Sequence, residues 1–379
     1  MRRILFCSQV PLDPRLGMGK HWLDLAESFR GLGWEARVAG PGEIAVGATR
    51  PSPGAFPAAL RDFLRRESAG FDVVEYDHAF LPFPRSDFPT GPLFVARCML
   101  LHHHFLTTTI PPIPGVWPGV RHALNAPRRR LRLGRIVARA DATVRQADLT
   151  VVSNDRDADA LAGHGADPGR IAVLPPGLTR ERFRRLASVP DAVPARPVVG
   201  FVGTFDPRKG MREFPGLVDR IARRVPGVTF RLLGTAGLVP DAEGVLRHFP
   251  SRLRPLLDVR PRYDPEELPA LLAGVSVGVF PSRVESFGYG VLEMLAAAIP
   301  VVAYDAPGPH VMLGPGDLVP IGSPGAMADR ACDLLGDADG LHAARLRARA
   351  TAAGFDWAEI AARTAATYSR LLDGGRTDR

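Results

Sequence analysis

Short apolar runs separated by turn-forming residues repeat along the chain and predict buried β-strands. In the first half they lie within residues 1–10 and at 36–39, 73–76, 93–96, 149–152 and 171–174. Helical periodicity fills several of the gaps, as in HWLDLAESFRGLGW, where Trp22, Leu25, Ala26 and Phe29 recur at helical spacing. Strands that alternate with helices predict a parallel α/β sheet with both faces covered.

The pattern stops and then restarts, which predicts two domains in series. Residues 184–197, RRLASVPDAVPARP, contain three prolines and lose the periodicity. Strand-like runs resume at 198–202, 229–233, 275–280 and 301–304, and residues 357–372 are periodic like a helix. We therefore expect a Rossmann-like domain at 1–183, a linker at 184–197, a second Rossmann-like domain at 198–355, and a C-terminal helix and tail at 356–379 as a candidate to cross back to the first domain. Ligands of Rossmann-like domains bind at the carboxyl ends of the strands. The expected ligand site is therefore a cleft between the carboxyl ends of the strands of the two domains.

The amino-acid composition bears on whether the chain binds nucleic acid. The chain has 379 residues, a net charge of +8 and a pI near 10.1, which suggests nucleic-acid binding. However, only Lys20 and Lys209 among the 48 basic residues are lysines, which leaves 46 arginines, and Ala, Gly and Pro are also abundant. This skew is typical of GC-rich coding rather than of a polyanion-binding surface, so no nucleic-acid partner is predicted.

Cysteine usage and apolar run length bear on the compartment. Cys7, Cys98 and Cys332 are far apart and lack metal-ligand spacing, which argues against a disulfide framework. The apolar run at 1–10 is shorter than that of a signal peptide, and no run reaches the ~18 residues of a membrane helix. A cytoplasmic location is predicted.

Two segments of the second domain carry candidate chemistry. Residues 280–296, FPSRVESFGYGVLEMLA, lead from a strand through a Ser/Glu/Gly turn into a helix whose start can bind an anion. Glu285 lies in the entry loop and Glu293 on the helix, where both can accept hydrogen bonds from a polyhydroxylated ligand. On spacing alone, a helix-terminal charge plus a solvated glutamate explains the pair equally well. Residues 203–210, GTFDPRKG, place Arg208 and Lys209 directly after a strand, where they suit phosphate oxygens.

These segments resemble glycosyltransferase family 4, whose members are retaining enzymes with the GT-B fold. The resemblance is carried by FVGTFDPRKG at 201–210, FRLLG at 230–234, YDPEEL at 263–268, FPSRVESFGYGVLEMLAAAIPVVAYD at 280–305 and WAEIAARTAATYSRLL at 357–372. In the first half, GMGKHWLDLAESFRGLGWEARVAGP and VVSNDRDADALAGHGADPGRIAVLPPGLTRERF are similar to the family's glycine loop and domain-closing segment. The resemblance to the family is weaker at residues 79–148.

The resemblance implies a hexosyltransferase that uses a nucleotide-diphosphate sugar, UDP in most of the family, without a metal ion or other cofactor. Glu285, Lys209 and Arg208 would be catalytic. Donor-binding residues would be Gly17, Gly19, Thr204, Arg208, Lys209, Glu285, Ser286, Phe287, Gly288, Tyr289 and Glu293. Thr204 departs from the family, which has an arginine there, and Arg208 is the candidate replacement.

Acceptor-side candidates are Lys20, His78, His102, His103 and His104. Consecutive histidines cannot all face one centre on a regular element, so His102–His104 are not predicted to bind a metal together. A structural role for His78 is as well supported as a cleft role. Asp155, Asp157 and Asp159 are interpreted as the cap and solvated face of a helix start rather than as metal ligands. Gly17-Met18-Gly19-Lys20 does not form a nucleotide-hydrolase loop, because Pro14 and His21 occupy required Gly and Ser/Thr positions.

Two alternative functions stay open. Residues 107–135 combine Ile110, Ile113, Val116 and Trp117 with Arg128, Arg129, Arg130, Arg132 and Arg135, a pattern that can bind an anionic membrane and would suit a lipid or lipid-linked acceptor. For this segment, an acceptor loop followed by a solvated basic helix is favoured over a membrane-binding surface. The second alternative is a nucleotide-sugar epimerase or binding protein of the same architecture. The acceptor class is not predicted: a small-molecule natural product, a glycan and a lipid are all compatible.

Overall fold

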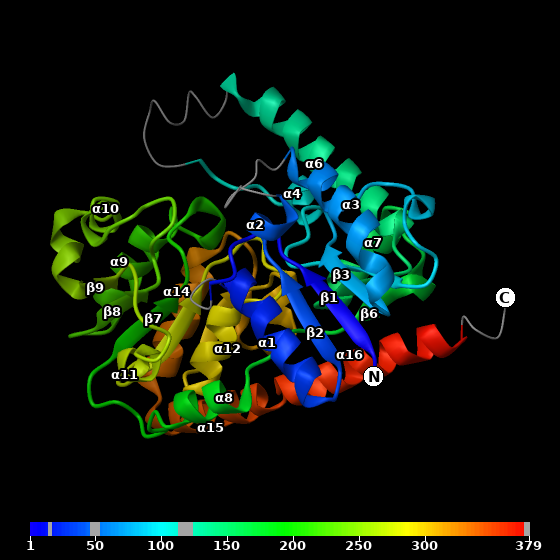
Figure 1. The fold of residues 1–379 in the computed structure, drawn as a ribbon. Helices are drawn as coiled ribbons and strands as arrows, with labels where there is room; N and C mark the ends of the chain where they lie inside the picture. Colours follow the sequence, from blue (N-terminus) through cyan, green and yellow to red (C-terminus); the bar gives the residue numbers. More distant parts are fainter. Residues whose placement is uncertain (14–16, 46–53, 113–123, 375–379) are drawn as a thin grey trace. The chain divides into compact units, whose positions relative to one another are not determined.

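A computed structural model describes residues 1–13, 17–45, 54–112 and 124–374. The chain folds into two compact units (Figure 1). The first comprises Met1–His104, Arg130–Thr179 and Phe355–Arg379, and the second comprises Phe105–Arg129 and Arg180–Gly354. The segment predicted as a linker, 184–197, lies in the second unit, and the C-terminal segment lies in the first.

The first unit is built on a six-stranded parallel sheet with the order β2-β1-β3-β4-β5-β6. The strands are the predicted apolar runs: β1 (Arg3–Cys7), β2 (Glu35–Ala39), β3 (Val73–Asp77), β4 (Leu93–Arg97), β5 (Leu149–Val152) and β6 (Ile171–Val173). Its helices are α1 (Gly17–Gly31), α2 (Pro41–Ile44), α3 (Phe56–Glu67), α7 (Asp155–Gly163) and α16 (Trp357–Gly374), while α4 (His104–Thr107) and α6 (Ala126–Gln146) run across the division between units. β3 and β4 are buried at every position, as expected for strands inside a parallel sheet with both faces covered, although they include the charged residues Glu75, Asp77 and Arg97.

Two apolar layers cover this sheet. One contains Trp22 and Phe29 of α1 together with Trp357 and Tyr368 of α16. The other contains apolar residues of α3, such as Phe63. Helix α16 is also fixed by polar contacts, because the Tyr368 hydroxyl donates to Glu75, whose carboxylate forms an ion pair with Arg97. The last helix of the chain is therefore an integral part of the first unit.

The second unit repeats the design with a parallel sheet of order β12-β11-β10-β7-β8-β9. Its strands are β7 (Val198–Val202), β8 (Thr229–Leu233), β9 (Leu257–Arg260), β10 (Val277–Phe280), β11 (Val301–Tyr304) and β12 (Leu318–Val319). Its helices are α8 (Arg180–Ala187), α9 (Phe214–Arg224), α10 (Ala242–Leu246), α11 (Leu268–Leu272), α12 (Tyr289–Ala296), α13 (Pro307–His310), α14 (Pro324–Gly336) and α15 (Ala338–Ala353), with short 3-10 turns that include η4 (Pro207–Lys209). α12 packs on β7, β10 and β11, and α9 packs against α14. The two central strands β7 and β10 thus end beside the loops that carry the predicted donor residues.

In the described part of the chain, no helix combines the length and the apolar character needed to cross a membrane.

Candidate functional site

The turn after β7 is shaped by its own polar residues. Asp206 caps η4 by accepting hydrogen bonds from the backbone N–H groups of Arg208 (2.9 Å) and Lys209 (3.1 Å). The Thr204 hydroxyl donates to the other oxygen of the same carboxylate at 2.7 Å. Gly210 has a φ of 85°, and a Cβ atom there would lie 2.5 Å from Cγ of Pro281. The turn therefore uses Thr204 for its own structure and fixes the backbone of the two cationic residues.

Glu285 joins these two cations in one cluster. Its Oε2 lies 2.6 Å from Lys209 Nζ and 3.2 Å from an Arg208 guanidinium nitrogen. Arg208 also donates to the carbonyl of Val284 at 2.8 Å. All three side chains are mostly buried, with exposed fractions of 13% to 22%. Burial alone would raise the pKa of Glu285, but the charges and hydrogen bonds of Lys209 and Arg208 outweigh it and hold this pKa below its ordinary value.

The loop between β10 and α12 is held by close backbone packing. A Cβ atom at Gly290 would lie 2.3 Å from the carbonyl oxygen of Val202, so α12 can approach the end of β7 only with glycine at this position. Similarly, a Cβ at Gly308 would lie 2.4 Å from the backbone of Phe287, and the Gly308 N–H donates to the Glu285 carbonyl at 2.8 Å. The second half of the loop that carries Glu285 is thus packed against Gly308, and the helix that follows it is packed against the end of β7.

The second predicted glutamate has a different partner. Glu293 lies in α12 and is nearly buried, and its Oε1 is 2.5 Å from a guanidinium nitrogen of Arg182 in α8. Tyr263 lies close to this pair. Burial first, and then the negative charge of Glu293, raise the pKa of the Tyr263 hydroxyl. The structure therefore places Arg182 and Tyr263 beside Glu293.

The glycine loop of the first unit is packed against its own chain. Gly17 is the first residue of α1. A Cβ at Gly19 would lie 2.5 Å from the carbonyl oxygen of Pro11, so a packing requirement within the loop is sufficient to explain this glycine. Lys20 forms an ion pair with Asp24, one helical turn on, with 3.4 Å between Nζ and Oδ2. Lys20 is thus a residue of the first turns of α1.

The predicted histidines fall into separate environments. His78 and His102 have stacked rings with centroids 6.0 Å apart, and His78 Nδ1 is 3.4 Å from an oxygen of Asp77. Burial, followed by the charge of His78, lowers the pKa of His102 to about 4. His103 and His104 point elsewhere, as His103 contacts Asp141 and His104 contacts Asp157. The three consecutive histidines do not face one centre, as the sequence predicts.

The helix that begins at Asp155 needs one correction. Its N-cap is Asn154, whose side chain accepts from the Asp157 N–H at 2.7 Å. Asp157, predicted on the solvated face, is fully buried and paired with His104. The helix start is correct, but a tertiary contact that sequence spacing does not reveal removes Asp157 from solvent.

Comparison with known proteins shows which proteins this chain resembles. Residues 196–337 match the family model described as Glycosyl transferases group 1. The chain is 33% identical over 247 residues to D-inositol 3-phosphate glycosyltransferase of Nocardia farcinica, an alignment that covers 60% of this chain and 54% of the relative. It is 28% identical over 355 residues to the enzyme of that name from Corynebacterium glutamicum, covering 86% and 78%. Residues 196–337 are therefore similar to the group 1 glycosyl transferases.

Solved structures establish the fold of this chain. Sucrose-phosphate synthase from Thermosynechococcus elongatus superposes with a TM-score of 0.76 at 19% identity and covers 99% of this chain and 100% of its own. Anabaena Alr3699/HepE in complex with UDP-glucose gives a TM-score of 0.71 at 18% identity, covering 97% and 100%. The predicted GT-B fold with two Rossmann-like domains is confirmed. The chain spans about half the length of the first curated relatives that it matches.

The sequence analysis does not assign a role to Arg182, Asp206 or Tyr263. Asp206 lies within the segment GTFDPRKG, and an Asp two residues before a basic pair is a recognisable cap of a short turn. Arg182 is 111 positions from Glu293, and in a chain with 46 arginines nothing distinguished it.

Proposed function

We propose that this chain is a retaining glycosyltransferase that moves a hexosyl unit from a UDP-sugar to a hydroxyl group of an acceptor. The observation that carries this proposal is the Lys209–Arg208–Glu285 cluster at the ends of β7 and β10. In the reaction, the bond from the anomeric carbon to the diphosphate oxygen breaks and a bond to the acceptor oxygen forms. The acceptor proton leaves with the nucleoside diphosphate, on which negative charge develops.

The cluster suits this charge development. Lys209 and Arg208 would bind the diphosphate oxygens, and partly buried cations fixed in advance stabilise such charge strongly. Glu285 stays ionised at neutral pH because its pKa is held low, so it can accept hydrogen bonds from the donor sugar. We propose that Glu293 binds the ribose hydroxyls and that Arg182 orients it. We also propose that transfer needs no metal ion, because Lys209 and Arg208 would provide the positive charge that a metal ion provides in other enzymes.

Donor and acceptor are proposed from the relatives. The structure of Alr3699/HepE holds UDP-glucose, which supports a UDP-sugar as donor. Several curated relatives are named D-inositol 3-phosphate glycosyltransferase, so D-inositol 3-phosphate is the first acceptor to test.

The test is turnover with a panel of UDP-sugars, with and without EDTA, followed by NMR of the product. We expect nucleotide release to depend on the acceptor, to survive EDTA, and to give a product with the anomeric configuration of the donor. Inverted configuration would contradict retention. Conversion of the sugar without release of UDP would favour an epimerase, and binding without turnover would favour a binding protein.

A second candidate function, action on a lipid or lipid-linked acceptor at an anionic membrane, is favoured by one observation. Residues 128–132 at the start of α6 are all exposed, and the exposed fractions of Leu124 and Leu131 are 74% and 58%. Ile113, Val116 and Trp117 of the predicted surface lie outside the described residues. Basic and apolar side chains exposed together suit an anionic bilayer.

Vesicle sedimentation tests this second candidate. We expect the chain to sediment with vesicles of anionic phospholipid but not of phosphatidylcholine, and Leu131→Glu with Arg132→Glu to abolish the difference. Leu238→Glu with Arg247→Glu, on exposed positions of the second unit, is the charge-matched control. Equal sedimentation of both double variants would rule out α6 as the contact.

A further inference from the structure

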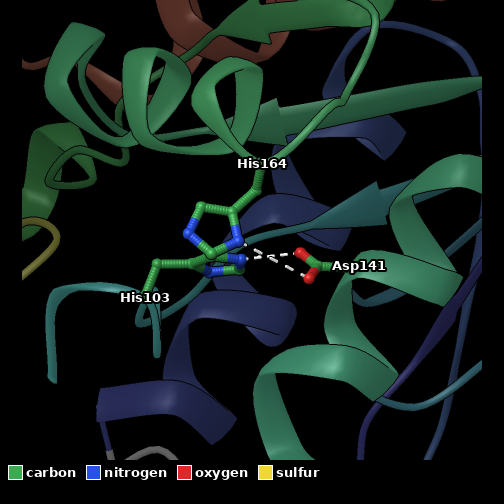
Figure 2. Close-up of side chains that lie close together, drawn as sticks. All are labelled: His103, Asp141 and His164. Carbon is green, nitrogen blue, oxygen red and sulfur yellow. Dashed lines mark hydrogen bonds and ion pairs between the residues drawn. The ribbon is translucent and has the colours of Figure 1, made fainter. Parts of the chain in front are cut away.

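Two histidines of the first unit are arranged around one carboxylate. His103 Nε2 lies 2.7 Å from Asp141 Oδ1, and His164 Nδ1 lies 3.6 Å from Asp141 Oδ2. The two imidazole rings are edge-on, with centroids 4.4 Å apart and an interplanar angle of 87°. Figure 2 shows both rings directed at the carboxylate from the same side. One donor atom from each residue lies within 4.8 Å of the other two.

Three separate elements bring these residues together. His103 lies in the segment between β4 and α4, Asp141 in the second half of α6, and His164 at the C-cap of α7. The exposed fractions of their side chains rise from 2% for His103 to 17% for Asp141 and 38% for His164. The His103 side chain is thus buried, while the His164 side chain is open to solvent.

The partners of Asp141 are unusual for this protein. Most carboxylates in ion pairs of this chain contact arginine, as Asp329 does with Arg220 and Arg224. Within the described ranges, the ion pairs of Asp141 are with His103 and His164 alone. A single His–Asp pair, such as His310 with Asp305, is enough for a surface hydrogen bond. A second imidazole on the same carboxylate goes beyond that need, and two protonated imidazoles at this separation would repel each other.

We propose that His103, Asp141 and His164 form a binding site for a divalent transition-metal ion, with Zn²⁺ as the natural occupant. Two imidazole nitrogens and one carboxylate oxygen are the donors that Zn²⁺, Co²⁺ and Ni²⁺ accept, whereas Mg²⁺ and Ca²⁺ prefer oxygen. A tetrahedral ion would take these three atoms, and a water molecule on the exposed side of His164 would complete the shell.

The ion would tie together the segment after β4, α6 and α7. Its expected effect is stabilisation of the first unit, because a ligand that binds the native state raises stability by mass action. The site takes no part in the proposed transfer, whose cations are Lys209 and Arg208 of the second unit.

Metal titration of the tag-free, EDTA-treated chain tests the site. We expect one Co²⁺ per chain with the visible absorption bands of tetrahedral nitrogen and oxygen coordination, displacement by Zn²⁺, and a higher melting temperature with Zn²⁺. His164→Gln removes the most exposed ligand without touching the core, and we expect it to weaken Zn²⁺ binding by at least about tenfold. Asp141→Asn is expected to do the same.

The matched control is His310→Gln, which removes a histidine paired with a carboxylate in the second unit and should leave binding unchanged. Absence of Zn²⁺ binding at micromolar concentration, or unchanged affinity in His164→Gln, would overturn the proposal. Failure of the glycosyltransferase assay would not, because these readouts do not involve turnover.

Discussion

At the residue scale, the Glu285 carboxylate forms ion pairs with two cations, Lys209 and Arg208. Lys209 Nζ lies 2.6 Å from it and also 4.9 Å from the centroid of the Phe280 ring, so the ammonium is fixed from two sides. A buried ion pair of this kind adds little net stability, because desolvation offsets the Coulomb attraction. In the proposed reaction, the pair would position the ammonium group before the diphosphate binds.

Replacing Lys209 tests this positioning. Lys209→Met keeps most of the side-chain volume and removes the charge, so we expect kcat to fall by about 10²–10³-fold, the usual loss when one group that stabilises transition-state charge is removed. Arg220→Met, which breaks an exposed ion pair with Asp329, is the control and should keep full turnover. Steady-state kinetics with the best UDP-sugar measure both variants. If the kcat of Lys209→Met stays within about twofold of the wild-type value, Lys209 has no part in the proposed reaction.

The pH dependence of stability tests the same carboxylate. The pKa of Glu285 is lower in the folded chain than in the unfolded chain, so its ion pairs stabilise the fold above the unfolded pKa of about 4.5 and lose this effect as pH falls through the folded value. We expect Glu285→Gln to lower the free energy of unfolding by about 3 kcal/mol at neutral pH, where two buried cations lose their partner. Urea unfolding should show this difference shrinking below about pH 4.5. A difference that is the same at pH 7 and pH 4 would contradict the assigned pKa direction.

The cluster could be predicted from sequence only in part. Lys209 and Glu285 were found because a rare lysine and a Ser/Glu/Gly turn each follow an apolar strand, which is local information. The Glu293–Arg182 pair is tertiary, as it joins α12 to α8, and neither residue's neighbours in sequence indicate the other. His103, Asp141 and His164 were likewise not grouped, because the distance between them depends on how α6 and α7 pack.

At the element scale, burial decides which strands a sequence reveals. β10 and β11 are buried at every position and were predicted from their apolar runs, with β10 beginning at Val277 rather than Val275. β9, with the sequence LDVR, is only half-buried at the edge of its sheet, and β12 has two residues. Neither forms an apolar run, so both were overlooked.

The packing of α12 on β7 depends on Gly290. A Cβ there would meet the Val202 carbonyl oxygen at 2.3 Å, and backbone cannot move aside as a flexible side chain can. We expect Gly290→Ala to lower the free energy of unfolding by roughly 1–3 kcal/mol through overpacking and to reduce turnover, because α12 carries Glu293. Gly216→Ala in α9 is the matched control, since no atom lies within 4 Å of its added Cβ. The control should be neutral or stabilising by up to about 1 kcal/mol. Denaturant titration of both variants measures the difference, and equal midpoints would contradict the predicted clash.

At the scale of the whole molecule, the charge of +8 is distributed rather than concentrated. Many arginines are neutralised locally, as Arg220 and Arg224 are by Asp329 and Arg185 is by Glu181 and Glu266. Polyanion affinity depends on how many phosphates a surface neutralises together, so net charge alone is a poor guide. Among the described residues of the second unit and of α6, the exception to this distributed charge is the group of exposed arginines at the start of α6.

We therefore expect weak binding of duplex DNA, with a Kd no tighter than about 10⁻⁶ M at physiological salt, which is the range of non-specific contacts. Fluorescence anisotropy over a series of salt concentrations measures the affinity and its slope. Arg128→Gln with Arg132→Gln should remove most of the residual binding, because these side chains form the one dense group of exposed positive charge in that region. Arg223→Gln with Arg247→Gln, which removes two arginines that are ion-paired within their own helices or turns, should change it little. Affinity tighter than about 10⁻⁷ M at physiological salt would show that the composition reflects a nucleic-acid partner after all.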